Sequence, residues 1–153
     1  MIDFTFHSKL KKQFNILLKK SCNIDLINMD SLPGDASKRK YFRLHHDEGT
    51  LIGVYGQDNK ENHSFVYLCK HFYSLGFPVP KLYASSIDKG IYIIEDLGDE
   101  TLAKRISSPS ISKEEVLSLY IQSAKDLVHF QILGHVGIDY ENNCHQSPVF
   151  DGN

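Results

Sequence analysis

Residues 30–44 constrain the fold most, because they join two strand-like runs through a polar turn. An apolar run at residues 24–29 precedes the turn and an aromatic run at residues 41–44 follows it, and both are typical of strands. The turn residues are turn-forming or small: Pro33, Gly34, Asp35, Ala36 and Ser37. Three cations follow at residues 38–40. The stretch predicts a hairpin whose tip offers backbone N–H groups beside positive charge, as a phosphate group requires, although taken alone it fits an ordinary polar turn better.

The spacing of apolar residues predicts an α+β fold with five antiparallel strands and one helix inserted among them. Besides the run at 24–29, strands are expected at residues 40–46, 50–55, 79–84 and 91–94. Helices are expected at residues 8–20, 60–75 and 100–106, and a long one from a capping box at Ser112 and Glu115 to Leu133. An acidic link, residues 95–99, separates the strands from the last helices, and residues 135–153 show no regular pattern.

Composition excludes several classes of function. A net charge of −2 argues against a general nucleic-acid binder. Cys22, Cys69 and Cys144 lie far apart, so we expect reduced thiols in a cytoplasmic protein, and the eight histidines have no metal-ligand spacing. The sequence shows neither a signal peptide nor an apolar run long enough for a membrane span, so no membrane partner is expected.

Three motifs in this order resemble those of the aminoglycoside-phosphotransferase and choline-kinase type of small-molecule kinases, which have a protein-kinase-like fold. LPGDASKRKYFRL at residues 32–44 is similar to the phosphate-loop hairpin of that family. Glu61, Asn62 and Phe65, followed by GFPVP at residues 76–80, resemble its inserted helix and the exit from it. IEDLGDETL at residues 94–102 resembles its hinge. Within the family, the motifs look most like those of the bacterial kinases for the anomeric hydroxyl of N-acetylmuramate and N-acetylglucosamine.

The resemblance implies a domain organisation and a set of site residues. Residues 1–95 would form an N-terminal nucleotide-binding lobe, residues 96–99 a hinge, and residues 100–153 the beginning of a helical C-terminal lobe. The ATP phosphates would be bound by Gly34, Asp35, Ala36, Ser37, Lys38 and Arg39. The adenine edge would meet backbone groups of Glu95, Asp96 and Leu97, whose carboxylates would be incidental or would cap a helix starting near Asp99. Glu61 is a further candidate, as a helix acid without its usual partner or as an acid favoured by the helix dipole.

The sequence departs from the family in two ways. Kinases of this fold place a lysine on the third strand, where it meets the phosphates, but here Val54 is nearest that position, so the phosphate contact is left to Lys38 or Arg39. The family's catalytic loop, His-Gly-Asp or His-Arg-Asp with a downstream Asn and a later metal-binding Asp, does not occur in residues 1–153. No catalytic residue or metal ligand is therefore assigned, and the chain is expected to be the N-terminal part of a longer or split enzyme.

The expected function is that of the ATP-binding portion of a kinase that transfers the γ-phosphate of ATP, with Mg²⁺, to a hydroxyl of a sugar or amino sugar. The alternatives are a non-catalytic, pseudokinase-like nucleotide-binding module, or a kinase for choline, homoserine or an aminoglycoside. Nothing in the residues separates these substrates or fixes an oligomeric state.

Overall fold

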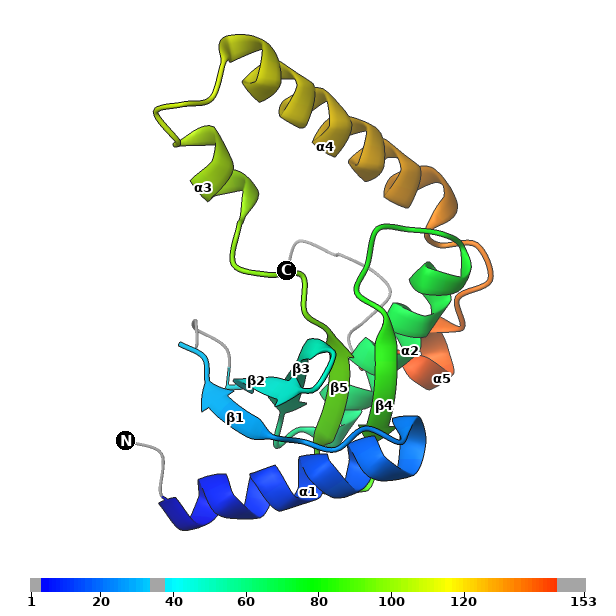
Figure 1. Cartoon of the computed structure of the whole chain (residues 1–153). Helices are drawn as coiled ribbons and strands as arrows, with labels where there is room; N and C mark the ends of the chain where they lie inside the picture. Colours follow the sequence, from blue (N-terminus) through cyan, green and yellow to red (C-terminus); the bar gives the residue numbers. More distant parts are fainter. Residues whose placement is uncertain (1–3, 34–37, 146–153) are drawn as a thin grey trace.

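The computed structural model describes residues 4–33 and 38–145, which fold as an α+β protein (Figure 1). In chain order the elements are α1 (Phe4–Cys22), β1 (Asn28–Ser31), β2 (Lys40–His46), β3 (Gly49–Tyr55), α2 (Asn59–Ser74), β4 (Leu82–Ser86), the 3₁₀ turn η1 (Ile87–Lys89), β5 (Ile91–Glu95), α3 (Leu102–Ile106), α4 (Lys113–Leu133) and α5 (Tyr140–Asn143). The predicted α+β class and the predicted antiparallel sheet with one inserted helix are confirmed.

The five strands form one antiparallel sheet in the order β1-β2-β3-β5-β4. The first strand begins four residues later than expected, because Ile24 and Leu26 pack on the core beside α1 and the register with β2 runs from Asn28 to Ser31. The fourth strand begins at Leu82 instead of residue 79, because Pro80 has no N–H to give to a ladder.

Helix α1 covers one face of the sheet through the apolar stripe that its sequence predicts. Leu10, Phe14, Leu17 and Leu18 are all buried, and they pack against Phe42 and Leu44 of β2, Leu51 of β3, and Ile91 and Ile93 of β5. Phe14 and Phe42 lie with their ring centroids 6.0 Å apart. This layer is the larger of the two hydrophobic clusters.

Helix α2 covers part of the opposite face (Figure 1). Val66 packs with Val54 and Tyr92, and the Phe65 ring stacks on Tyr92 at 4.9 Å. The helix ends as predicted at Gly76, whose φ of 77° lies in the left-handed region that favours glycine. Leu75, the last residue of the expected range 60–75, is exposed because it lies at the C-cap.

The chain after the sheet leads away from it through the link to α3 and α4 (Figure 1). Helix α4 starts at the predicted capping box of Ser112 and Glu115 and returns to α2 at its C-terminal end, where Phe130 packs on Phe72 and Phe77. Much of its apolar surface is exposed: Leu117, Tyr120, Ile121, Leu127, Val128, Ile132 and Leu133.

Two corrections concern the last helices. Helix α3 begins at Leu102, later than the expected residue 100, because Thr101 is its N-cap. Residues 140–143 form the short helix α5, although the tail was expected to be irregular. Asp139 caps it, and the backbone N–H of Asp139 donates to the Tyr67 hydroxyl at 2.9 Å, a tertiary contact that no local pattern reveals. In the ranges described, no helix is long and apolar enough to cross a membrane.

Phe14→Ala should destabilise the chain by about 3–5 kcal/mol, because it removes a fully buried ring from between α1 and the sheet. The matched control is Ile16→Ala on the same helix, which should change stability by no more than about 0.5 kcal/mol because Ile16 is 60% exposed. Urea unfolding at pH 7 measures both. Equal losses would contradict the assignment of this face to the core.

Candidate functional site

Strand β2 sends alternate side chains to opposite faces of the sheet, and this alternation organises the site. Phe42 and Leu44 point to α1, whereas Tyr41 packs on the cluster that includes α2. Arg39, just before the strand, reaches α2, and Arg43 reaches the link after β5. One face of β2 therefore carries a cation, an aromatic ring and a second cation in succession.

A cleft of about 350 Å³, here called the link cleft, lies between this face and the link. Its lining includes three partly buried apolar side chains, Tyr41, Ile52 and Ile94, each from a different strand. The remaining lining residues are Leu32, Pro33, Arg43, Pro80, Glu95, Asp96, Leu97, Gly98 and Asp99. The cleft thus combines an apolar floor with a backbone edge made by the link.

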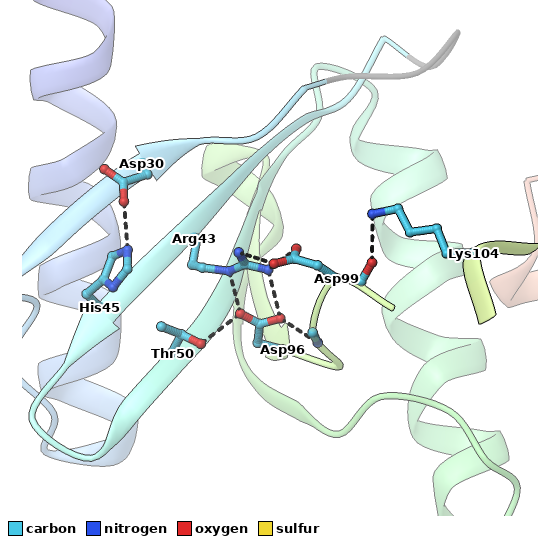
Figure 2. A network of polar contacts seen from close by, with 8 residues as sticks. Asp30, Arg43, His45, Thr50, Asp96, Asp99 and Lys104 are labelled. Atoms are coloured by element: carbon cyan, nitrogen blue, oxygen red, sulfur yellow. Dashed lines mark hydrogen bonds and ion pairs between the residues drawn. The ribbon is translucent and has the colours of Figure 1, made fainter. Parts of the chain in front are cut away.

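Arg43 binds the link at two points (Figure 2). Its Nε and Nη2 donate to the Asp96 carboxylate at 2.7 and 3.3 Å, and its Nη1 and Nη2 donate to the Asp99 carboxylate at 3.1 and 2.7 Å. The Asp96 carboxylate also accepts from the Thr50 hydroxyl at 2.7 Å and from the Gly98 N–H at 2.9 Å. The link is therefore tied to β2 and β3 by side chains.

The two carboxylates of this network are held ionised. Burial alone would raise the pKa of Asp96, but hydrogen bonds from Arg43, Thr50 and the Gly98 N–H outweigh burial and lower it. The hydrogen bonds from Arg43 lower the pKa of Asp99 as well. Asp96 is the buried anchor, with a side chain only 6% exposed, whereas Asp99 is 74% exposed.

A second cleft of about 590 Å³, here called the loop cleft, lies at the other end of β2 beside the start of α2. It is lined by Lys38, Arg39, Gly56, Gln57, Asp58, Asn59, Lys60 and Glu61. Arg39 Nη2 lies 3.0 Å from Glu61 Oε1, and the guanidinium lies 5.2 Å from the centre of the Phe65 ring. Glu61 and Phe65 thus hold the Arg39 head group at the cleft from one turn of α2.

The start of α2 is fixed by a close approach to the end of β3. Asp58 caps the helix by accepting from the N–H groups of Lys60 and Glu61. The buried Asn62 amide donates to the Gly56 carbonyl at 2.8 Å. A Cβ on Gly56 would lie 2.4 Å from Asn62 Oδ1, so this position requires glycine. The position of Glu61 beside Arg39 depends on these contacts.

The predicted site residues fall into two groups along this face. Lys38, Arg39 and Glu61 line the loop cleft, whereas Glu95, Asp96 and Leu97 line the link cleft. Gly34, Asp35, Ala36 and Ser37 lie outside the described residues. Within the part of the chain that is described, the backbone N–H and C=O of Leu97 have no hydrogen-bond partner, and the residue is 68% exposed. Leu97 lines the link cleft, and its backbone donor and acceptor are not used by any other described residue.

Three expectations about side chains need correction. Asp96 is a partly buried anchor for Arg43, and its carboxylate is not incidental. Neither Glu95 nor Asp96 caps the helix after the link, because Thr101 is its N-cap. Glu61 has a partner, Arg39, contributed by the β1–β2 connection and not by β3.

Sequence reasoning missed the roles of Arg43 and Thr50. A signal was present, because Arg43 lies in an aromatic strand between two residues that point to the core, and a half-buried cation needs an acidic partner. The partner lies 53 residues later in the chain, so the pairing itself could not be predicted. Leu51, the neighbour of Ile52 on β3, faces α1 and not the cleft.

Metal ligands do not assemble among the residues that the structure describes: no group of three or more His, Cys, Asp or Glu side chains is placed to hold an ion there. The sequence matches no protein-family model and no curated protein. A functional assignment therefore rests on the geometry of the two clefts and on the resemblance of the three motifs.

Asp96→Asn should lower the free energy of unfolding at pH 7 by about 2 kcal/mol, because it breaks a partly buried, bidentate ion pair. The folded pKa of Asp96 lies below its ordinary value of 3.8, so this stabilisation is present above pH 3.8 and is lost as the pH falls through the lower, folded pKa. Urea unfolding from pH 7 to pH 3 should show the difference between wild type and variant shrinking at the acid end.

Asp25→Asn is the control for this series, since it breaks an exposed ion pair with Lys19 and should change stability by no more than about 0.5 kcal/mol. A difference between wild type and Asp96→Asn that stays constant down to pH 3 would contradict the role of the ionised carboxylate.

Proposed function

We propose that the chain is the N-terminal, ATP-binding part of a small-molecule kinase of protein-kinase-like fold. Residues 1–95 are its nucleotide-binding lobe, residues 96–99 its hinge, and residues 100–153 the beginning of its helical lobe. The intact enzyme transfers the γ-phosphate of ATP to a hydroxyl of a sugar or amino sugar. The observation that carries the proposal is the link cleft, which has apolar side chains and is lined by Leu97, whose backbone N–H and C=O have no partner in residues 4–33 and 38–145.

The link cleft suits an adenine base. A purine has flat apolar faces, which Ile52, Ile94 and the Tyr41 ring would contact. Its edge carries an acceptor and a donor, N1 and the N6 amino group, which match the backbone N–H and C=O at the edge of the cleft. Leu97 offers both groups without a competing partner among the described residues. The resemblance of residues 94–102 to a kinase hinge supports the same placement.

The loop cleft suits the phosphates. Arg39 and Arg43 are four residues apart along β2, which corresponds to about 13 Å, comparable to the span of a nucleoside triphosphate from base to γ-phosphate. A nucleotide with its base in the link cleft would therefore bring its phosphates to Lys38 and Arg39. Gly34, Asp35, Ala36 and Ser37 complete the proposed phosphate loop on the strength of the motif.

Arg39 replaces the lysine that kinases of this fold carry on the third strand. Val54 is fully buried between Tyr41 and Tyr92, its partners on the neighbouring strands, and offers no charge. Arg39 lies on the adjacent chain segment, on the same face as Tyr41, and is paired with Glu61 of the inserted helix. The cation and its helix acid are thus both present, but the cation comes from the hairpin. An arginine also binds phosphate oxygens in bidentate fashion.

The carboxylates near the two clefts, among the residues that the structure describes, are already engaged by other groups. Asp96 and Asp99 are bound to Arg43, Asp58 caps α2, and Glu61 is paired with Arg39. We place the magnesium ligands and the aspartate that accepts the substrate proton in a catalytic loop that residues 1–153 do not contain.

A non-catalytic nucleotide-binding module is the second candidate, and the buried Val54 favours it, because a module without chemistry needs no lysine there. The Arg39–Glu61 pair favours the kinase, because a charge held at the phosphate end is what transfer chemistry uses.

Arg39→Ala should weaken MgATP binding about 10- to 100-fold, the loss expected for a charge-assisted hydrogen bond. Adenosine binding should change by less than about twofold, since Arg39 lies at the phosphate end. Isothermal titration calorimetry of the chain measures both. The matched control is Arg105→Ala, which removes an arginine from an exposed ion pair with Glu115 and should bind MgATP as wild type does. Unchanged MgATP affinity in Arg39→Ala would exclude Arg39 as the phosphate cation.

The 153-residue chain should transfer no phosphate from ATP to N-acetylmuramate, N-acetylglucosamine, glucose or choline above the uncatalysed rate, because the catalytic loop does not occur in its sequence. A radiolabelled-phosphate assay with MgATP tests this. Turnover that Arg39→Ala abolishes would mean that the catalytic groups lie within these residues.

A further inference from the structure

The link between β5 and α3 has little secondary structure of its own to hold it. Glu95 is the last residue of β5, Thr101 is the N-cap of α3, and Gly98 has a φ of 81°. Leu97 and Gly98 are exposed, and a Cβ on Gly98 would meet nothing within 4 Å. A segment of this kind keeps a defined backbone only if side chains fix it from outside.

Arg43 supplies that fixation from both sides of Leu97 and Gly98. One guanidinium makes four hydrogen bonds, two to Asp96 before the pair and two to Asp99 after it (Figure 2). The Thr50 hydroxyl of β3 also donates to the Asp96 carboxylate. At the other end of the link, Lys104 of α3 donates to the Asp99 carbonyl at 2.9 Å. The exposed pair is thus bracketed between two tethered residues.

The chemistry of arginine is required for this arrangement. The planar guanidinium has five N–H donors in a fixed fork and binds two carboxylates from different directions, whereas a lysine ammonium offers one point charge. Asp96 also accepts from the Gly98 N–H, so the anchor that Arg43 holds shapes the turn after Leu97 directly.

We propose that Arg43 is a positioning residue for base selection, which acts by fixing the Leu97 backbone at the edge of the link cleft. The proposal rests on the nucleotide-binding function proposed above. A fixed N–H and C=O match adenine, which presents an acceptor at N1 and a donor at N6. They oppose guanine, which presents a donor at N1 and an acceptor at O6. A link released from Arg43 can rearrange to accept either purine, so fixation determines selectivity as well as affinity.

The test compares Arg43→Gln, Arg43→Lys and Asp99→Asn with a control on the same strand. His45→Gln is that control, because it alters the 2.8 Å contact between His45 Nε2 of β2 and the Asp30 carboxylate of β1 without touching the link. For each protein, calorimetry gives the affinities for MgATP, MgGTP and tripolyphosphate, and circular dichroism reports whether it folds.

Arg43→Gln should lower the ratio of MgATP to MgGTP affinity about tenfold, the equivalent of one hydrogen bond to the base, and leave tripolyphosphate affinity within about twofold. Arg43→Lys should fail to restore the ratio, and His45→Gln should retain the wild-type ratio. Asp99→Asn should lower the ratio of MgATP to MgGTP affinity by a smaller factor. This variant replaces Arg43→Gln in the test if Arg43→Gln does not fold, because the Asp99 side chain is 74% exposed and its replacement leaves the core intact. A wild-type ratio in the folded variants would overturn the proposal.

Amide hydrogen exchange separates this inference from the proposed function. In the absence of nucleotide, the Gly98 N–H, which donates to Asp96 Oδ1 at 2.9 Å, should exchange at least about tenfold faster in Arg43→Gln than in wild type or His45→Gln. If wild type binds neither nucleotide, the proposed function fails, and base selection by Arg43 fails with it. The rate of amide hydrogen exchange in the link then decides whether Arg43 fixes its backbone. Equal exchange rates in all three proteins would overturn the positioning role even where nucleotide binds.

Discussion

The rest of the structure depends on the alternation of side chains along β2. Phe42 and Leu44 face α1 and form the centre of the larger core, so the register of β2 is fixed by hydrophobic burial. Side chains that alternate with these two must face the other way, which places Arg39, Tyr41 and Arg43 on the opposite side of the sheet. A shift of the β2 register by one residue would turn Arg39 and Arg43 toward the core and would expose Phe42 and Leu44. The positions of the proposed nucleotide contacts are therefore set by the packing of α1 on the far face.

The two arginines on this face are each held by acids from elsewhere in the chain, but in different ways. Arg39 is paired with Glu61 on a helix whose start is fixed by Asp58 and by the contact between Gly56 and Asn62. Arg43 instead fixes its partners, because Asp96 and Asp99 belong to a link with little other support. The first pair places a charge at the loop cleft, and the second places a backbone edge at the link cleft. Between them lies the apolar floor of Tyr41, Ile52 and Ile94.

The sequence predicted the regular elements well where periodicity and local signals agree. The helices expected at residues 8–20 and 60–75 form as α1 and α2, and the capping box of Ser112 and Glu115 opens α4. Prediction failed where a local signal competes with a distant contact. In the apolar run at residues 24–29, the first residues pack beside α1 and only the last ones belong to a strand. The tail forms α5, which contacts Tyr67.

The sequence by itself determined the α+β class, the antiparallel meander and which residues carry charge near the hairpin, because these follow from side-chain periodicity, turn chemistry and residue type. Only the tertiary structure decided which charges meet. Arg39 lies beside Glu61, 22 residues away, because α2 packs over one face of the sheet. Arg43 lies beside Asp96, 53 residues away, because β5 pairs with β3 in the sheet. Ion pairing acts through space, and separation along the chain carries no information about it until the core has fixed the strands.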